Sequence, residues 1–397
     1  MEELLELSEE KILNTALSFK RHLFSRINWT NRLIGIKGAR GTGKTTLVLQ
    51  WLKELNLKKN ETVYVSLDDL YFTANTLLTT VRKFRQHGAK IVVLDEVHKY
   101  PNWAKEIKNL YDRYTDLKII FTGSSVIDIS RQEGDLSRRA LIYELKGMSY
   151  REFLDFQYEK RLPVFTLEQL LDPGLNLRTQ FDEDFKPLEF FQEYLEYGYY
   201  PFFKEDKGGY LQRLRQLVRF IVEYDMAELK GFDIRHAKKM LQLLYVVAQS
   251  VPFKPNINKL AEKTGIHRNS INNYLYFLHE AKLVELLHQA GSSMATLQKP
   301  EKIYMENTNL LFALSESPPS KGTVREVFFN NQLSGQYKVT HSPVTDFEVD
   351  NKYSFEIGGQ SKGRKQIASL SKAWVVKDDL EYPVGNALPL WIFGFLY

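Results

Sequence analysis

The sequence predicts an α/β fold in which a parallel sheet presents a functional site at one edge. Two observations lead to this prediction. Apolar runs at residues 33–37, 91–95 and 117–125 have the length of buried parallel strands, and amphipathic helical spacing separates them. A glycine-rich loop follows the first run, and two carboxylates end the second. Since parallel strands bring their carboxyl ends to one sheet edge, we expect the loop and the acids to meet there.

The composition indicates a folded chain with more than one core. Its 397 residues are enough for two or three domains, and 43% of them are hydrophobic. A net charge of +5 is mild for this length and does not by itself indicate nucleic-acid binding. The chain has no cysteine, which excludes disulfides and cysteine-ligated metals.

The ends of the sequence give no sign of membrane targeting. Residues 1–17 are acidic and amphipathic, without the basic start and apolar core of a signal peptide. The longest apolar stretch, residues 388–397, is about half as long as a membrane-spanning helix. We therefore expect a cytoplasmic protein without membrane contact, whose last residues form a buried strand or a docked segment.

Residues 38–45, "GARGTGKT", complete the pattern G-x-x-x-x-G-K-[ST] between a predicted strand and a predicted helix. In such a P-loop, backbone N–H groups surround phosphate oxygens and the helix N-terminus adds positive charge. We expect Lys44 to neutralise the β- and γ-phosphates and Thr45 to hold Mg²⁺. The residues expected to bind nucleotide are Gly38, Ala39, Arg40, Gly41, Thr42, Gly43, Lys44, Thr45 and Thr46.

Two adjacent acids, Asp95 and Glu96, end the strand at 91–95. We expect Asp95 to support the Mg²⁺ ion together with Thr45, and Glu96 to orient and deprotonate an attacking water. A kinase that transfers phosphate to a substrate hydroxyl needs no such water-activating acid. The pair therefore favours hydrolysis over phosphoryl transfer. The spacing between Thr45 and Asp95 leaves room for a helix, a strand at 62–70 and another helix, as in an ATPase with an additional strand.

The strand at 117–125 ends at the same sheet edge, after an amphipathic helix at 103–114. Thr122, Ser124 and Ser125 lie there and are suited to sense a γ-phosphate or the attacking water. We predict that Ser124 has this sensing role. Capping of the next helix is the alternative for both serines.

A further strand is predicted at 139–145, and two arginines stand at its start. Arg139, rather than Arg138, is predicted to reach the γ-phosphate of a neighbouring subunit as an arginine finger. The alternative is that both are solvated surface arginines. Three isolated histidines, His98, His267 and His279, are expected to be solvated or packed, since no cluster has the spacing of metal ligands.

The middle of the chain is predicted to be helical. Proline and glycine interrupt short helical stretches between residues 160 and 210, and the aromatic segment 193–203 reads as a hinge packed on the ATPase part. Amphipathic helices are expected within 210–226 and 235–250.

A helix–turn–helix followed by a strand is predicted next, with one helix ending at Gly265, another from Arg268 to Ala281, and a strand at 283–287. This order is typical of a winged helix. Use of the winged helix as a protein-contact scaffold on the ATPase is the alternative to DNA binding. Residues expected to be exposed and able to meet DNA are His267, Arg268, Asn269, Asn272 and Asn273. The buried face is expected to contain Ile271, Tyr274, Leu275 and Leu278.

The C-terminal stretch "VTDFEVDNKYSFEIGGQSKGRKQI" resembles the core of restriction-endonuclease-like folds. Asp346 and Glu356 match the acids that bind Mg²⁺ in that chemistry, but Gly358 occupies the lysine position. Lys362 or Lys365 would have to replace it. Alternating acids from 346 to 350 also fit a solvated strand face. We expect a degenerate fold used for packing or binding rather than an active nuclease.

The order of these motifs resembles the AAA+ ATPases, and most closely a prokaryotic subgroup with a winged helix and a nuclease-like C-terminal domain. The resemblance rests on "GARGTGKTT", "VVLDEVHKYPNW", "IIFTGSS", "LSRRALIYELKGMSYREFLDF", "YGYYPFF" and "DFEVDNKYSFEIGG". The family usually has Gly-Arg where this chain has Arg138-Arg139, so Arg139 is the matching arginine. The resemblance implies an ATPase that acts as an oligomer, with ATP as its nucleotide.

The predicted organisation has four parts: an ATPase domain at 1–158, a helical connector at 159–210, a helical and winged-helix region at 211–300, and a degenerate nuclease-like domain at 301–397. The predicted function is Mg²⁺-dependent ATP hydrolysis that switches the winged-helix and C-terminal parts, with action on DNA as one use. The alternative is an ATP-gated protein-assembly module without a DNA role. An ATP-controlled nuclease is less favoured, because Gly358 lacks the required amine.

Overall fold

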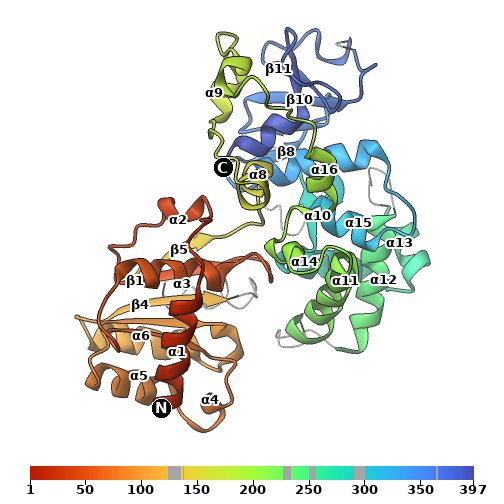
Figure 1. The fold of residues 1–397 in the computed structure, drawn as a ribbon. Coiled ribbons are helices and arrows are strands. Elements are labelled where there is room, and N and C mark those ends of the chain that lie inside the picture. Colours follow the sequence, from red (N-terminus) through yellow and green to blue (C-terminus); the bar gives the residue numbers. More distant parts are fainter. Residues whose placement is uncertain (124–135, 137, 227–233, 250–255, 290–299, 364) are drawn as a thin grey trace. The chain divides into compact units, whose positions relative to one another are not determined.

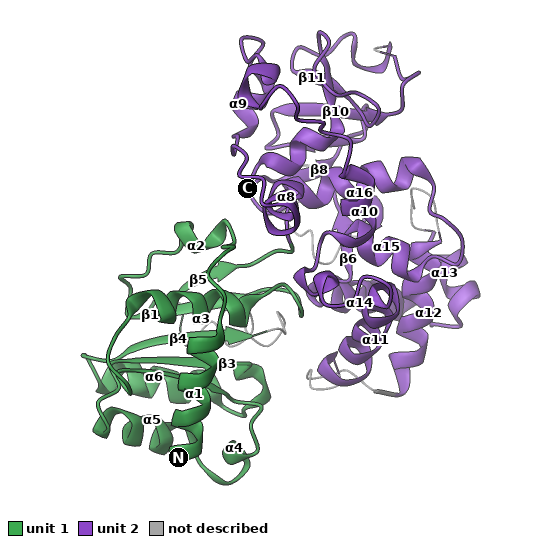
Figure 2. Cartoon of the chain, viewed as in Figure 1, with its two compact units in different colours: residues 1–147 green, residues 148–397 purple. Residues whose placement is uncertain are grey.

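The computed structural model of the protein describes residues 1–123, 136, 138–226, 234–249, 256–289, 300–363 and 365–397. The chain forms two compact units, Met1–Gly147 (unit 1) and Met148–Tyr397 (unit 2), which have different colours in Figure 2. Residues 148–158, which the sequence analysis placed with the ATPase, belong to unit 2. The four-part division otherwise stays a prediction.

Unit 1 alternates strands and helices as the apolar spacing predicts (Figure 1). Its strands are β1 (Leu33–Lys37), β2 (Thr62–Ser66), β3 (Ile91–Asp95), β4 (Lys118–Gly123) and β5 (Leu141–Glu144). Its helices are α1 (Glu2–Asn14), α2 (Leu23–Arg26), α3 (Lys44–Leu55), α4 (Tyr71–Ala74), α5 (Leu77–Gln86) and α6 (Trp103–Arg113).

Within the described residues, the strands of unit 1 form a five-stranded sheet in the order β2-β3-β4-β1-β5, with every pair parallel. The predicted parallel sheet is therefore confirmed. Its two faces bury separate apolar clusters, with Val48 and Trp51 of α3 on one side and Phe84 and Ile107 of α5 and α6 on the other. β4 lies between β1 and β3, so the loop after β1 and the acids at the end of β3 flank the end of β4.

The helix α1 packs against β2 and α3. The Ser8 hydroxyl of α1 accepts a hydrogen bond of 2.8 Å from the backbone N–H of Tyr64 in β2. After α1 the chain runs along α3, where the Gln50 side chain donates to the carbonyl oxygens of Ala16 and Phe19 at 2.9 and 2.7 Å. The N-terminal segment is thus fastened to the helix that begins at the P-loop.

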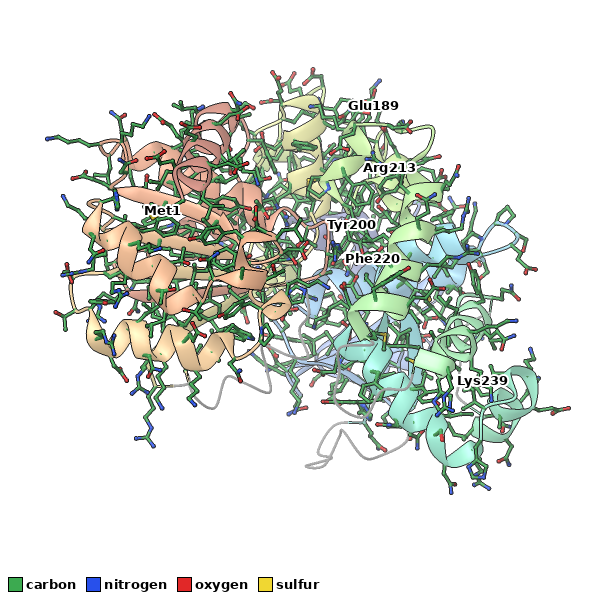
Figure 3. All side chains as sticks on the ribbon, turned by 90° about the horizontal axis from the view of Figure 1, so that it is seen from below. Met1, Glu189, Tyr200, Arg213, Phe220 and Lys239 are labelled. Atoms are coloured by element: carbon green, nitrogen blue, oxygen red, sulfur yellow. The ribbon has the colours of Figure 1, made fainter. Side chains whose placement is uncertain are left out.

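Unit 2 contains helices and strands. Its helices are α8 (Tyr150–Tyr158), α9 (Leu167–Leu171), α10 (Phe191–Tyr197), α11 (Tyr210–Phe220), α12 (Ala237–Ala248), α13 (Ile257–Thr264), α14 (Arg268–Glu280), α15 (Thr308–Leu314) and α16 (Lys321–Leu333). Its strands are β6 (Val284–Leu287), β7 (Lys302–Met305), β8 (Val339–His341), β9 (Phe347–Val349), β10 (Tyr353–Gly358), β11 (Ala373–Lys377) and β12 (Ala387–Pro389). Figure 3 shows their side chains, with Arg213 and Phe220 labelled on α11.

The helix α8 starts with a capping box, in which Ser149 and Glu152 satisfy each other's backbone N–H groups. The box gives partners to two backbone N–H groups that the first turn of the helix would otherwise leave without one. Its aromatic side chains pack inside unit 2, where the ring centroid of Tyr150 lies 5.1 Å from that of Phe191 and 6.0 Å from that of Phe395. These contacts place α8 with the helices and C-terminal residues of unit 2. The spacing of apolar residues within α8 does not show which part of the chain the helix packs against.

The helices α12, α13 and α14 pack together, and β6 and β7 then pair antiparallel. Gly265 ends α13 with a φ of +62°, a left-handed conformation that favours glycine. The predicted elements are present here within two residues of the expected bounds.

The last strands form a sheet in the order β12-β11-β10-β9-β8 among the described residues. β8, β9 and β10 pair antiparallel, whereas β10, β11 and β12 pair parallel. A 3₁₀ segment, Leu390–Phe395, follows β12 and packs against α8 and α16. Trp391 and Phe393 in this segment are fully buried, so the apolar C-terminal stretch is a docked segment, one of the two predicted forms.

Candidate functional site

The P-loop curls tightly between β1 and α3. Gly38 cannot carry a side chain, because a Cβ atom there would lie 2.2 Å from the carbonyl oxygen of Leu145. Gly43 precedes α3 with a φ of +93°, again a glycine conformation. The Lys44 side chain turns back into the loop and donates to the carbonyl oxygens of Gly38 and Ala39 at 3.0 and 2.9 Å. A single ammonium group therefore lies inside the ring of backbone that the motif predicts to hold phosphate.

The carboxylate of Asp95 is the centre of a hydrogen-bond network. Its Oδ2 atom accepts from the Thr45 hydroxyl at 2.7 Å and from the Tyr64 hydroxyl at 2.6 Å. Its Oδ1 atom accepts from the Thr122 hydroxyl and from the backbone N–H of Glu96, the latter at 3.1 Å. Asp95 is only 2% exposed, so these four donors fix the carboxylate in one orientation.

The structure thus brings Asp95 into contact with Thr45, the neighbour of Lys44, although 50 positions of sequence separate Thr45 from Asp95. Thr45 and Asp95 supply hydroxyl and carboxylate oxygens, the ligand types that Mg²⁺ prefers. This direct contact between them is the observation that fits a metal to this position. Sequence reasoning missed Tyr64, because only strand register shows that its side chain reaches across from β2 to the end of β3.

Glu96 follows the strand in a left-handed conformation with a φ of +51°. Such a conformation is uncommon for a residue with a side chain and is concentrated at functional sites. Its Oε2 atom lies 3.5 Å from Nε2 of His98, which is buried. Burial first, and then the positive charges of Lys99, Lys44 and Arg40, together lower the pKa of His98 to about 3. A neutral imidazole therefore faces the Glu96 side chain at neutral pH.

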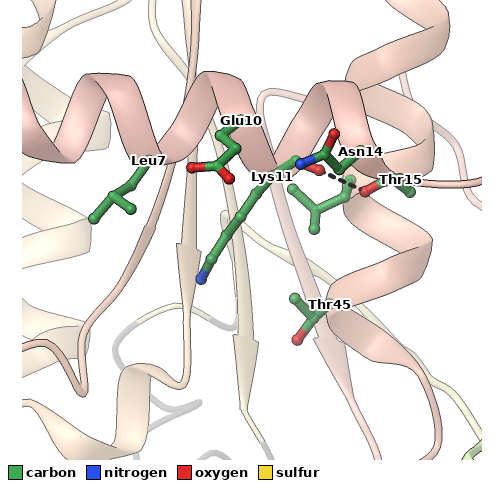
Figure 4. Close-up of a pocket in the computed structure, with 7 residues that line it drawn as sticks. Leu7, Glu10, Lys11, Asn14, Thr15 and Thr45 are labelled. Atoms are coloured by element: carbon green, nitrogen blue, oxygen red, sulfur yellow. Dashed lines mark hydrogen bonds between the residues drawn. The ribbon is translucent and has the colours of Figure 1, made fainter. Parts of the chain in front are cut away.

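A surface pocket of about 530 Å³ opens beside Thr45, between α1 and α3 (Figure 4). Lys11 projects from α1 into it, and its Nζ atom lies 4.9 Å from the ring centroid of Tyr64. The lining residues are Leu7, Glu10, Lys11, Asn14, Thr15, Thr45 and Leu49. This pocket makes one side of Thr45 accessible from the surface of unit 1.

Ser124 and Arg139 are the two other residues predicted to be catalytic. Ser124, with Ser125, lies outside the described residues. Arg139 forms a bidentate ion pair with Asp112 of α6, with Nε–Oδ1 and Nη2–Oδ2 distances of 2.8 and 2.9 Å. Both side chains are partly exposed, so an incoming group could compete for the guanidinium. Its neighbour Arg138 is exposed.

A second charged cluster lies in unit 2. The Lys302 ammonium of β7 lies 3.1 Å from Oε2 of Glu326 and 3.2 Å from Oδ1 of Asp346. Burial alone would lower the pKa of Lys302, but the charges of both acids and the hydrogen bonds to them raise it above its ordinary value. Lys362 pairs with Glu356. Every acid of this cluster therefore has a lysine partner.

This cluster shows which of the two lysines, Lys362 or Lys365, lies near Glu356 in place of the lysine that Gly358 lacks. Gly358 ends β10, and Lys362 covers it closely enough that a Cβ atom on Gly358 would lie 2.5 Å from the Lys362 side chain. Lys362 thus reaches Glu356 from the following loop, whereas Lys365 is exposed. Sequence reasoning missed Lys302 and Glu326, which lie on a strand and a helix upstream of the predicted core.

The exposed face of α14 carries the residues predicted to meet DNA. Arg268, Asn269, Asn272 and Asn273 are all exposed. Ile271, Tyr274, Leu275 and Leu278 are buried. His267 is exposed and caps the helix by accepting from the backbone N–H of Asn269 at 3.4 Å.

Within the described ranges of the chain, no group of three or more His, Cys, Asp or Glu side chains is arranged to hold a metal ion. Among the described helices, none has both the length and the apolar character needed to cross a membrane.

Comparison with known families agrees with the geometry of unit 1. Residues 30–154 match the family model described as AAA domain. Residues 188–321 match a family described only as a domain of unknown function, DUF8612. The first match shows that this part of the chain is similar to AAA domains, which is consistent with the parallel sheet of unit 1.

One curated relative, the uncharacterized protein MJ1637 of Methanocaldococcus jannaschii, is 28% identical over 289 residues. The match covers 70% of this chain and 61% of that protein, so the chain spans less than two thirds of the relative's length. Two solved structures are similar at a distance. The Walker-type ATPase PABY2304 of Pyrococcus abyssi is 14% identical with a TM-score of 0.46, over 75% of this chain and 95% of that one. AMPPCP-bound DnaA of Aquifex aeolicus is 16% identical with a TM-score of 0.26, over 66% and 85%.

Proposed function

We propose that this protein is a Mg²⁺-dependent ATP hydrolase whose nucleotide state switches the arrangement of unit 2. The observation that carries the proposal is the Asp95 carboxylate, which accepts from Thr45 at 2.7 Å beside a complete P-loop. Binding of ATP rather than another nucleotide is favoured by the resemblance to AAA+ ATPases.

Each residue has a separate task in this proposal. The P-loop amides and Lys44 bind the phosphates, and Thr45 and Asp95 would hold Mg²⁺, which would neutralise charge on the phosphate oxygens. Glu96 orients the attacking water and accepts its proton, with the neutral His98 beside it. Ser124 senses the γ-phosphate, and Arg139 completes the site of a neighbouring copy after release from Asp112.

The first test is nucleotide binding by wild type and Lys44→Ala, measured with a fluorescent ATP analogue. Lys44→Ala removes the ammonium inside the loop, so we expect affinity to fall at least tenfold. Lys83→Ala is a matched control, because Lys83 is an exposed lysine of α5 and lies outside the P-loop. Normal affinity of Lys44→Ala would remove this residue from the phosphate site.

A second proposal concerns DNA. The exposed polar face of α14 supports a winged helix that contacts a duplex through Arg268, Asn269, Asn272 and Asn273. Steady-state ATP turnover with and without duplex DNA, over a salt series, tests this. DNA stimulation that fades as salt rises supports the proposal, and Arg268→Ala should weaken it. Turnover that is indifferent to DNA would favour the alternative, an ATP-gated protein-assembly module.

A further inference from the structure

A buried arginine outside the predicted site contacts the P-loop. Arg21 lies between α1 and α2, is only 6% exposed, and has a guanidinium that bonds in two directions. Its Nη1 atom donates to the carbonyl oxygen of Thr42, within the P-loop, at 2.7 Å. Its Nη2 atom donates to the carbonyl oxygens of Lys146 and Gly147 at 2.7 and 2.8 Å. The planar guanidinium keeps its charge and a fixed spacing of donors, so it joins these carbonyls rigidly.

The segment at 145–147 touches the P-loop at a second point. The Leu145 carbonyl oxygen packs directly on Gly38, and the Leu145 N–H donates to the carbonyl oxygen of Lys37 at 2.7 Å. The beginning of the P-loop and its Thr42 carbonyl are therefore both attached to residues 145–147. These are the last residues of unit 1, through which the chain leaves it.

The segment that carries Arg21 is itself held on α3. The Lys53 side chain donates to the carbonyl oxygens of Leu13 and Thr15 at 2.7 and 2.8 Å, in addition to the bonds from Gln50 to this segment. Arg21 consequently has a fixed origin on the helix that begins at the P-loop. A change in loop geometry at Thr42 must then move the guanidinium or break its bond.

We propose that Arg21 is a positioning residue that couples the nucleotide-bound geometry of the P-loop to the exit segment 145–147. The proposal rests on the nucleotide binding proposed above. Phosphates that order the loop amides also fix the Thr42 carbonyl, and Arg21 passes this order to the carbonyls of Lys146 and Gly147. The exit segment is thereby stiffer with nucleotide than without it.

Hydrogen–deuterium exchange of the full chain tests the coupling, with and without saturating AMPPCP and Mg²⁺. In wild type we expect the analogue to slow exchange at least threefold in peptides that cover 38–45 and also in those that cover 145–147. Arg21→Met removes all three bonds. Arg21→Lys keeps the charge, but one ammonium cannot reach both groups of carbonyls. In both variants the P-loop is expected to be protected at saturation, while protection of 145–147 is lost.

Arg26→Met is the matched control, since Arg26 is exposed in the same segment. It should behave as wild type. The proposal is overturned if Arg21→Lys retains wild-type protection of 145–147, which would make Arg21 merely structural. It is also overturned if wild type protects 38–45 without changing 145–147, a result that needs no folded variant. If AMPPCP protects neither segment in wild type, nucleotide binding itself fails, and the coupling with it.

Discussion

The Tyr64 hydroxyl is expected to position Asp95 for metal binding, and Tyr64→Phe tests this. The substitution removes one of two donors to Oδ2 of a buried carboxylate and leaves the ring packed. A hydrogen bond to a charged group contributes about 1.5–3 kcal/mol. Three other donors to Asp95 remain, so we expect the lower figure, about 1.5 kcal/mol. For a unit of this size the loss lowers the melting temperature by about 3–6 °C.

The functional effect should exceed this loss of stability. Removing a group that orients a metal ligand typically costs about 10–100-fold in metal affinity or activity. Because Thr45, Thr122 and the Glu96 N–H still hold Asp95, we expect a shift of about tenfold. The assay is ATP turnover against Mg²⁺ concentration at saturating ATP, in which Tyr64→Phe raises the half-saturating Mg²⁺ concentration about tenfold.

Tyr100→Phe is a matched control in the same unit. Its hydroxyl also donates to a carboxylate, that of Glu106, at 3.0 Å, so its removal should cost similar stability without touching the metal site. Two results would refute the reasoning. One is an unchanged Mg²⁺ requirement in Tyr64→Phe, and the other is an equal shift in both variants, which would trace the effect to stability alone.

Two further predictions concern Arg139 and His98. Arg139→Ala should cut ATP turnover at least tenfold without lowering ATP affinity. Asp112→Ala removes only the ion pair with Arg139 and should keep turnover. Equal losses in both variants would make the pair structural. His98 should make unfolding depend on pH, because its pKa is about 3 when folded and about 6.5 when unfolded. As the pH falls, the unfolded chain binds the proton before the folded chain does. The contribution of His98 to the free energy of unfolding is therefore complete above pH 6.5 and falls by about 2 kcal/mol between pH 6.5 and 5. Urea unfolding of wild type and His98→Asn at both pH values measures it, and identical pH slopes would contradict the assignment.

The sheet and P-loop of unit 1 could be predicted because their signals are local. The strand runs, the glycine pattern and the acids at a strand end all lie within short windows of sequence. Lys44, Thr45 and Asp95 could be brought together because parallel strands share one edge. The position of Tyr64 could not be predicted, because it depends on the register in which β2 pairs with β3. No local sequence pattern specifies that register.

Contacts between residues that are far apart in the sequence could not be predicted either. Arg21 meets Lys146, which lies 125 positions away, and a lone arginine in an irregular segment has no pattern that suggests a backbone partner. The contact between Lys302 and Asp346, which are 44 positions apart, could not be predicted for the same reason. The helix α8 was predictable as a helix from its capping residues. Its membership of unit 2 follows from aromatic packing against the far end of the chain, which local spacing does not encode.

The central claim is that Glu96 activates water for ATP hydrolysis, and the most direct measurement is steady-state ATP turnover of wild type and Glu96→Gln at saturating Mg²⁺. The substitution preserves size and the backbone N–H that bonds to Asp95, so ATP affinity should stay unchanged. Loss of a general base slows turnover about 10²–10⁴-fold, or about 3–5 kcal/mol in the barrier. Glu61→Gln, a surface acid paired with Lys90, should match wild type. The account predicts tight binding with turnover at least about 100-fold slower in Glu96→Gln. Turnover equal to wild type would contradict it.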